Sequence, residues 1–546
     1  MIITSILEKN ARFYPYDCAL VEINPSEDRD KAVTWREASL VANADEGAPY
    51  RREINWKTFD REANRYANLL LSRGFKKGTK IGMLLMNCLE FLPIYFGILK
   101  AGMIVVPMNY RYTSDEIKYC LELADVSCLF FGREFIERLD AIKDEIPAVG
   151  TLFFVGTKDR PVYGEDLLSL RYFYSAELPP VEIHESDLAA IYFSSGTTGF
   201  PKAILHRHAA LTASCMTEQN HHGQKKDDVF LCIPPLYHTG AKMHWFGSLL
   251  SGSKAVILKG IKPEWILRTV TEEKCTIVWL LVPWAQDILD AIDAGEIDLD
   301  HYLLDQWRLM HIGAQPVPPS LIKRWKKVFP HHEYDTNYGL SESLGPGCVH
   351  LGVENIDKVG AIGKAGYLWQ AKVLNEKDEE VKGDEVGELV VKGPGVMIEY
   401  YKNPEVTAEI KKGDWLYTGD MARVDEDGFI YLVDRKKDVI ISGGENLYPV
   451  QIEDFLRAND KIKDVAVIGM PDHRLGEIAC AIIEVKEGMN MSEEEVNEFC
   501  MELPRYKRPR KIIFDKVPRN PTGKIEKPLL REKYNKGRLV ESQITS

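Results

Sequence analysis

The segment at residues 192–202 carries the residue types and spacing of a phosphate-binding loop. It follows an apolar run at 188–193 that predicts a buried strand, and it reads Tyr-Phe-Ser-Ser-Gly-Thr-Thr-Gly-Phe-Pro-Lys. Its glycines let the backbone approach an anion, its hydroxyls add donors, and its lysine adds positive charge. The spacing differs from a Walker A loop, because two residues rather than four separate the glycines. We therefore predict that a phosphate group is bound by Ser194, Ser195, Gly196, Thr197, Thr198, Gly199 and Lys202.

Four segments farther along the chain hold polar residues in short patterns. They are Asn-Tyr-Gly-Leu-Ser-Glu at 337–342, Tyr-Thr-Gly-Asp at 417–420, Asp-Arg-Lys-Lys-Asp-Val-Ile-Ile-Ser-Gly-Gly-Glu at 434–445 and Pro-Arg-Asn-Pro-Thr-Gly-Lys at 518–524. Together with the first loop they resemble, in order and over nearly the whole chain, the acyl-adenylate-forming superfamily. That superfamily contains acyl-CoA synthetases, the adenylation domains of nonribosomal peptide synthetases, and luciferases.

The resemblance implies a chemistry that the motif residues suit. Making an acyl-adenylate brings a carboxylate against the α-phosphate of ATP, so positive charge and a metal ion must offset the repulsion between two anions. Glu342 is expected to hold Mg²⁺, since this hard cation prefers oxygen ligands. Lys524 is expected to bring its ammonium group to the α-phosphate and the attacking carboxylate together. The catalytic residues implied by the resemblance are Lys524, Thr198, Glu342 and His238.

The same resemblance implies how the nucleotide is held. Tyr338 is expected to stack on the adenine, Asp420 to accept the ribose hydroxyls, and Arg435 to contact the ribose and a phosphate. Without the motif, a lone tyrosine is more often core packing, and an aspartate after Thr-Gly can be a turn former. The remaining nucleotide contacts are expected from Gly313, Ala314, Gln315, Pro316, Asn337, Gly339 and Ser341.

The motif Pro-Pro-Leu-Tyr-His-Thr-Gly at 234–240 resembles the segment that borders the carboxylate pocket in this superfamily. His238 is therefore placed beside the acyl carboxyl group, as a gate rather than a metal ligand, although a core histidine is the alternative. The predicted acyl pocket comprises Tyr237, His238, Trp245, Trp284 and Gly339, with Met243, Phe246 and Trp279 in the same segments. The resemblance also places Gly443, Gly444 and Glu445 beside the pantetheine of coenzyme A.

These residues favour one branch of the superfamily. An amino-acid adenylation domain needs a carboxylate near Thr239 to pair with the substrate ammonium, and Ala241 and Lys242 follow instead. We predict an AMP-forming acyl-CoA synthetase that uses ATP, Mg²⁺ and coenzyme A, with a medium-chain or ring-bearing carboxylic acid as substrate. The alternatives are an adenylating enzyme that passes the acyl group to a carrier protein, and a luciferase-like oxygenase. A degenerate paralogue that only binds nucleotide is disfavoured because the charged motif residues are all present.

Composition bounds the class of protein and its partners. The 546 residues suggest two to four domains, and a net charge of −13 argues against a nucleic-acid partner. The 10 cysteines are scattered without a Cys-x-x-Cys pair, so we expect reduced, mostly buried thiols. The N-terminus has no signal-peptide pattern and no stretch predicts a membrane span, so we expect a cytoplasmic protein; a homodimer is compatible with the sequence.

The pattern of elements predicts an α/β fold. Strand-like and helix-like segments alternate from Trp56, which favours doubly wound, mostly parallel sheets. From about residue 366 short alternating strands predict a small barrel-like subdomain, and a compact α/β lid follows. The predicted domains are 1–436, with the barrel-like part at 366–436, and the mobile lid at 437–546, with the hinge at Lys437. The charged segment Pro25 to Tyr50 resembles a surface insertion.

Overall fold

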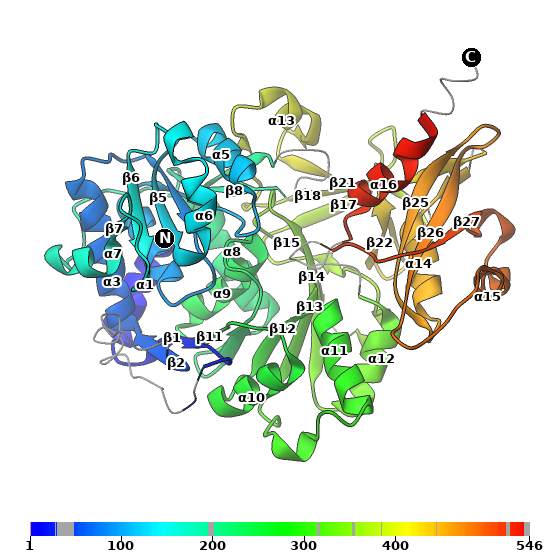
Figure 1. The fold of residues 1–546 in the computed structure, drawn as a ribbon, viewed down its shortest axis with the longest axis horizontal. Helices are drawn as coiled ribbons and strands as arrows, with labels where there is room; N and C mark the ends of the chain where they lie inside the picture. Colours follow the sequence, from blue (N-terminus) through cyan, green and yellow to red (C-terminus); the bar gives the residue numbers. More distant parts are fainter. Residues whose placement is uncertain are drawn as a thin grey trace.

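The computed structural model describes residues 2–27, 29, 49–194, 201–313, 317–351, 355–383, 385–443, 445–519 and 525–539. Two large sheets with helices around them fill the N-terminal part, and a smaller antiparallel sheet and a C-terminal α/β unit follow (Figure 1). This architecture confirms the predicted fold class.

The first large sheet has eight strands in the order β19-β9-β8-β4-β3-β5-β6-β7. Its strands pair in parallel except around β9, which returns antiparallel to β8 and pairs with β19 at the edge. Buried apolar strands joined by helices are typical of a doubly wound sheet. The elements are α3 (Trp56–Ser72), β3 (Lys80–Leu84), α4 (Phe91–Lys100), β4 (Ile104–Pro107), α5 (Ser114–Leu123), β5 (Val126–Gly132), α6 (Ile136–Asp140), β6 (Thr151–Val155), β7 (Glu165–Asp166), α7 (Leu167–Leu170), β8 (Leu188–Phe193), β9 (Ala203–Arg207) and β19 (Glu399–Tyr400).

The second large sheet has nine strands in the order β16-β15-β14-β13-β12-β10-β11-β1-β2. It is parallel from β14 to β1 and antiparallel at both ends. Its elements are α1 (Ile3–Phe13), β1 (Cys18–Ile23), β2 (Arg51–Asn55), α8 (His208–His221), β10 (Val229–Cys232), α9 (Thr239–Ser251), β11 (Lys254–Leu258), α10 (Pro263–Glu273), β12 (Ile277–Leu281), α11 (Val282–Asp293), β13 (Leu309–Gly313), α12 (Pro319–Val328), β14 (Glu333–Leu340), β15 (Gly345–Leu351) and β16 (Lys364–Ala365).

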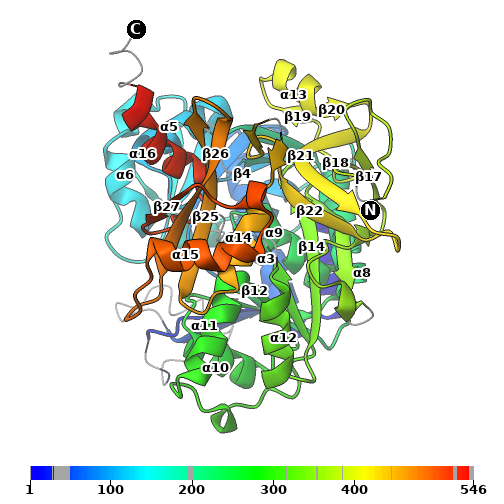
Figure 2. The same cartoon turned by 90° about the vertical axis from the view of Figure 1, so that its right-hand side faces the viewer.

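The two smaller sheets follow in sequence. The third is antiparallel and contains β17 (Gln370–Leu374), β18 (Gly387–Lys392), β20 (Lys411–Lys412), β21 (Trp415–Val424) and β22 (Ile430–Arg435), with α13 (Pro404–Ile410) beside it. The C-terminal unit contains β23 (Ile440–Ser442), β24 (Glu445–Leu447), α14 (Pro449–Arg457), β25 (Ile462–Asp472), β26 (Gly476–Val485), α15 (Glu493–Phe499), β27 (Lys511–Phe514) and α16 (Lys527–Leu539). Figure 2 shows this unit in orange and red in front of the large sheets. The predicted domain boundary falls between β22 and β23.

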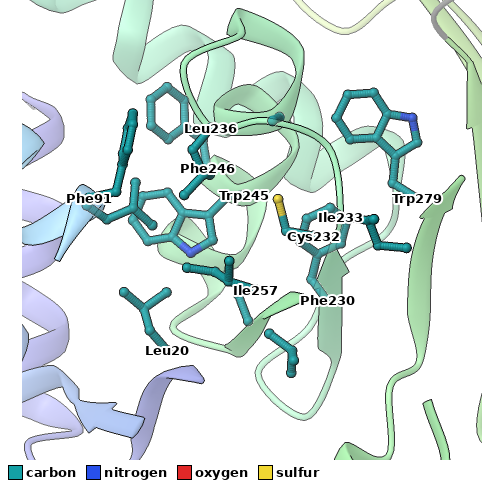
Figure 3. Packing of buried hydrophobic residues seen from close by; sticks show 14 of the residues in the cluster. Leu20, Phe91, Phe230, Cys232, Ile233, Leu236, Trp245, Phe246, Ile257 and Trp279 are labelled. Atoms are coloured by element: carbon teal, nitrogen blue, oxygen red, sulfur yellow. The ribbon is translucent and has the colours of Figure 1, made fainter. Parts of the chain in front are cut away.

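The main hydrophobic core lies where α3, α4 and α9 pack against the large sheets. Trp245 of α9 contacts Phe59 of α3 and Phe96 of α4, with ring centroids 6.0 and 5.8 Å apart. Figure 3 shows the Trp245 ring among Leu20, Phe91 and Ile257. Burying such large aromatic groups contributes strongly to stability, so this core fixes the first turn of α9, where the candidate site begins.

Three sequence expectations concern the rest of the chain. All ten cysteines are free, and most of them are buried, as predicted. Within the described residues, no helix is both long and apolar enough to cross a membrane. Most of the segment predicted as a surface insertion lies outside the described residues, but Tyr50 at its end donates a hydrogen bond to Glu272 (2.7 Å).

Candidate active site

The predicted phosphate loop joins two antiparallel strands that hold its ends together. The Ser194 N–H donates to the Lys202 carbonyl, and the Lys202 N–H donates to the Ser194 hydroxyl, each at 3.0 Å. The loop is thus closed at its base by β8 and β9. The central loop residues Ser195, Gly196, Thr197, Thr198 and Gly199 lie outside the described residues.

Three of the predicted nucleotide residues form one hydrogen-bonded group. The Tyr338 hydroxyl donates to Asp420 Oδ2, and the Arg435 guanidinium lies 2.5 Å from Asp420 Oδ1. Asp420 and Arg435 face each other across β21 and β22. Burial, and then the carboxylate of Asp420, raise the pKa of Tyr338 well above its usual value, so this hydroxyl keeps its proton and donates.

Glu342 lies beside this group, in the turn between β14 and β15. Its Oε1 accepts a hydrogen bond from the Tyr400 hydroxyl at 2.7 Å, and the ring of Tyr400 lies 5.0 Å below the Lys202 ammonium group. Although burial opposes its charge, Arg435 has a raised pKa because Asp420 and Glu342 are both near. Tyr400 therefore links the phosphate loop to the predicted metal ligand, a role that no sequence motif indicated.

His238 caps the N-terminus of α9 and is held by its own helix. Its Nδ1 accepts the Gly240 N–H at 3.2 Å. Lys242, one turn later, is buried and donates to the carbonyl oxygens of Leu236 (2.7 Å), Tyr237 (2.9 Å) and His238 (3.2 Å). Burial lowers the pKa of Lys242 well below its usual value. Lys242 thus fixes the loop that carries His238, which the sequence did not reveal.

The predicted acyl-pocket aromatic residues separate into different environments. Tyr237 packs edge-on against Tyr110, with centroids 5.4 Å apart, next to His238. Trp279 lies close to Gly240, where an added Cβ would come within 3.0 Å of its ring. Trp245 instead belongs to the core around α3 and α4, well apart from Trp279 in Figure 3. Trp284 is nearly buried in the first turn of α11.

The other predicted site residues fall at strand ends around this group. Gly313 ends β13, while Asn337 and Gly339 lie on β14, where the ladder is irregular between Tyr338 and Gly339. The Ser341 hydroxyl lies 3.2 Å from the Thr239 hydroxyl, which joins the β14 turn to the start of α9. Ala314, Gln315, Pro316, Gly444 and Lys524 lie outside the described residues.

The residues predicted to contact coenzyme A lie in the C-terminal unit, and the predicted hinge residue lies between β22 and β23. Gly443 lies in the β23–β24 hairpin with φ +61°, and Glu445 follows it, exposed. Across the predicted hinge at Lys437, Asp434 Oδ2 accepts the Val450 N–H at 2.9 Å. Burial raises the pKa of Asp434 to about 6.

The whole arrangement can bind a nucleoside phosphate and an organic anion together. Lys202, the carboxylate of Glu342 and the group of Tyr338, Asp420 and Arg435 lie around the carboxyl end of β14. Open α/β sheets bind ligands at the carboxyl ends of their strands. His238 enters the same region from α9, through the contact between Thr239 and Ser341. This is the geometry expected for activation of a carboxylic acid by a nucleotide.

Comparison with known proteins identifies the family. The model of the AMP-binding enzyme family matches residues 28–401, and that of the AMP-binding enzyme C-terminal domain matches residues 451–524. The chain therefore belongs to the AMP-binding enzyme family, which confirms the family predicted from its motifs.

Its relatives define the branch. A long-chain-fatty-acid–CoA ligase, FadD13 of Mycobacterium tuberculosis, is 31% identical over 87% of this chain and 92% of that protein. The 4-hydroxybutyrate–CoA ligase 2 of Metallosphaera sedula is 30% identical over 85% and 87%. ATP-bound MatB of Rhodopseudomonas palustris has a TM-score of 0.84 at 25% identity, covering 98% of this chain and 99% of that one. The protein is an enzyme of the AMP-forming acid–thiol ligase class.

Replacing Asp420 by asparagine is expected to weaken ATP binding. The substitution keeps the shape but removes the charge that Arg435 and Tyr338 contact, and hydrogen bonds to charged groups are worth about 1.5–3 kcal/mol. We expect KM for ATP to rise about 10–100-fold, with the fold retained because water reaches the Arg435 side chain, which is 38% exposed. The matched control is Asp425→Asn, which removes an ion pair to Lys358 on the same sheet. An unchanged KM in Asp420→Asn would contradict the assignment.

Proposed function

We propose that this enzyme is an acyl-CoA synthetase whose substrate is a medium-chain or ring-bearing carboxylic acid. In the first step the acid attacks the α-phosphate of ATP, giving acyl-AMP and pyrophosphate; in the second, the thiol of coenzyme A displaces AMP. ATP, Mg²⁺ and coenzyme A are the proposed cofactor and co-substrates. The observation that carries the choice of acid is the aromatic surface around His238.

That surface is formed by Tyr110, Tyr237 and Trp279. Tyr237 stands edge-on to Tyr110 and adjoins His238, and Trp279 packs against the first turn of α9 at Gly240. Aromatic and apolar walls with one polar group at the end suit a hydrophobic acid whose carboxylate meets His238. We include Trp284 in the proposed pocket and assign Trp245 to the supporting core, since it contacts Phe59 and Phe96.

An amino-acid substrate is disfavoured by the charges at the same place. A substrate ammonium group needs a carboxylate partner when it leaves water. The described residues at the start of α9 offer Thr239 and the buried amine of Lys242 instead, and Lys242 is committed to three carbonyl oxygens.

The catalytic groups act on the phosphate side. Glu342 would hold Mg²⁺ through an oxygen ligand, with Tyr400 orienting the carboxylate; Mg²⁺ would neutralise charge on the phosphates. Lys524 and Thr198 are proposed to contact the phosphates and Asp420 the ribose. Gly443, Gly444 and Glu445 are proposed to border coenzyme A after the lid turns about Lys437. We also propose that the enzyme is cytoplasmic and that it forms a homodimer.

One assay distinguishes the proposed reaction from the two alternatives, transfer to a carrier protein and a luciferase-like oxygenation. Purified enzyme is given ATP, Mg²⁺ and a panel of straight-chain, branched and ring-bearing acids, with and without coenzyme A, and pyrophosphate and thioester are both measured. We expect that the enzyme releases pyrophosphate over many turnovers only when coenzyme A is present, and that the rate is highest for a medium-chain or ring-bearing acid. Adenylate formation without thioester would favour a carrier protein, and light or oxygen consumption would favour a luciferase-like reaction. The highest rates with acetate or an amino acid would overturn the substrate class.

A further inference from the structure

A cluster of buried histidine and acidic side chains lies beneath the nucleotide site and takes no part in the proposed reaction. It draws on four elements: α8, α9, β13 and β14. Every member is at most 5% exposed. Its members are Glu218 and His221 on α8, His222 directly after α8, His244 on α9, His311 on β13 and Asp335 on β14.

The geometry of the cluster places several possible metal-binding atoms around one point. The candidate ligand atoms of His221, His222, His311 and Asp335 all lie within 4.8 Å of one another. His221 Nε2 is 3.4 Å and His222 Nε2 is 3.9 Å from Asp335 Oδ2. A tetrahedral zinc ion with bonds of 2.0–2.1 Å keeps its ligand atoms about 3.4 Å apart, so small ring movements would complete the site.

His311 faces the same carboxylate with one of its ring nitrogens. His311 Nδ1 lies 2.6 Å from Asp335 Oδ1, so Nδ1 is its candidate ligand atom, and an ion bound there would replace this hydrogen bond. Outside these four residues, Glu218 Oε2 lies 2.9 Å from His244 Nδ1. A carboxylate that accepts a ring N–H of a histidine fixes its tautomer and ring orientation, as outer partners do in metal sites.

Several ring nitrogens of this cluster have no hydrogen-bond partner within the part of the chain that the structure describes. Both ring nitrogens of His221 and of His222, together with His311 Nε2, are buried without a hydrogen-bond partner among the described residues. Leaving one buried polar group without a hydrogen bond typically costs about 1–3 kcal/mol. Five such ring nitrogens in one place therefore indicate that an additional ligand binds there.

We propose that His221, His222, His311 and Asp335 bind one divalent transition-metal ion, Zn²⁺ in the first instance, with Glu218 and His244 as outer partners. Three imidazoles and one carboxylate suit Zn²⁺, whereas Mg²⁺ prefers oxygen ligands and keeps several waters. The site is therefore distinct from the Mg²⁺ site at Glu342. Four protein ligands in a fully buried position make it structural.

Its position connects it to the nucleotide site. His311 lies two residues before Gly313, and Asp335 lies two residues before Asn337. The ion would therefore link β13 and β14, the two neighbouring strands that lead into these predicted nucleotide-binding residues. Asn337 Nδ2 also donates to Glu218 Oε1 at 3.2 Å. The ion would hold α8 against β13 and β14 directly under the adenine side of the site.

The test is metal analysis of the full-length enzyme, purified without chelators and with any histidine tag removed. We expect about one zinc per chain by plasma mass spectrometry. After removal with dipicolinate, the melting temperature should fall, and it should recover on adding Zn²⁺. Added Co²⁺ should give the intense visible absorption of a tetrahedral site. Metal well below one per chain, together with no Co²⁺ spectrum, would overturn the proposal in favour of a cluster satisfied by buried water.

Variants locate the ion. His222→Gln and Asp335→Asn should each abolish stoichiometric zinc and the Co²⁺ spectrum. The matched control is His332→Gln, which changes a buried histidine that stacks on Phe329, outside the cluster, and should leave both unchanged. If the two ligand variants retain zinc at one per chain, the ion is bound elsewhere and the site is wrong. Should they fail to fold, the chelation and Co²⁺ measurements on the unaltered enzyme still decide.

Discussion

Replacing Lys524 by alanine is expected to lower the rate of acyl-adenylate formation by about 10²–10³ and to leave thioester formation from a supplied acyl-adenylate nearly unchanged. The ammonium group of Lys524 is proposed to stabilise the negative charge that develops between the carboxylate and the α-phosphate. Attack of the thiol on the carbonyl carbon develops no such charge at the α-phosphate, so this second step does not need the ammonium group. Pyrophosphate exchange measures the first step, and transfer from chemically made acyl-AMP to coenzyme A measures the second.

The residues on either side of the Lys524 loop are held on the C-terminal unit. Arg519 pairs with Ile525 in an antiparallel bridge, and its guanidinium lies 2.6 Å from Asp464, so the base of the loop is held on the C-terminal unit. The matched control is Lys516→Ala, which removes an exposed lysine from the same unit and should change neither step. Equal loss of both steps in a folded Lys524→Ala enzyme would contradict the assignment.

Replacing Lys437 by proline is expected to separate the two half-reactions in the opposite sense. The first step needs Lys524 over the α-phosphate, and the second needs a clear path for the thiol to the same carbon, so we predict that the C-terminal unit turns about Lys437 between them. Proline fixes φ near −65° and also restricts Lys436. Adenylation should stay within about tenfold of the unaltered enzyme, while acyl-CoA formation should fall much further, as expected when one of two conformers is lost.

The contacts on either side of the hinge indicate what holds the present arrangement. The Lys436 N–H donates to the Gly419 carbonyl (2.9 Å), and Asp434 accepts from Val450 (2.9 Å). Proline at 437 leaves both N–H groups intact. Lys437→Ala is the control, because it removes the side chain and keeps the backbone free; it should support both steps. A folded Lys437→Pro enzyme that makes acyl-CoA at the normal rate would place the pivot elsewhere.

The sequence predicted the architecture because apolar patterns and glycine positions record it locally. The strand β8 occupies the predicted residues 188–193, since it is a short apolar run that ends at a turn signal. The residue ranges alone did not reveal that β9 returns antiparallel to β8. Strand direction depends on pairing partners, which a local pattern does not contain.

The site was partly predictable for a related reason. Motifs named Tyr338, Asp420 and Arg435, but their contact arises because β21 and β22 pair in one register and β14 ends beside them. Tyr400 and Lys242 have no motif around them. Their roles come from tertiary position: Tyr400 at the sheet edge, and Lys242 one turn along α9.

The histidine cluster is a stronger example of contacts that a local sequence pattern does not contain. Glu218, His221 and His222 follow the i, i+3, i+4 spacing of one helix face, a visible signal that alone more often marks packing than a metal site. His244, His311 and Asp335 come from three other elements. Trp245 is the converse case, since its segment suggested the acyl pocket and its contacts lie in the core.

The most direct test of the account follows one oxygen atom through the reaction. The enzyme is given an acid that carries ¹⁸O at both carboxylate oxygens, with ATP, Mg²⁺ and coenzyme A, and the AMP and acyl-CoA are analysed by mass spectrometry. If the carboxylate attacks the α-phosphorus and AMP then leaves from the carbonyl carbon, each AMP gains one ¹⁸O and each thioester keeps one. Unlabelled AMP, or label in inorganic phosphate with ADP as the other product, would contradict the acyl-adenylate mechanism.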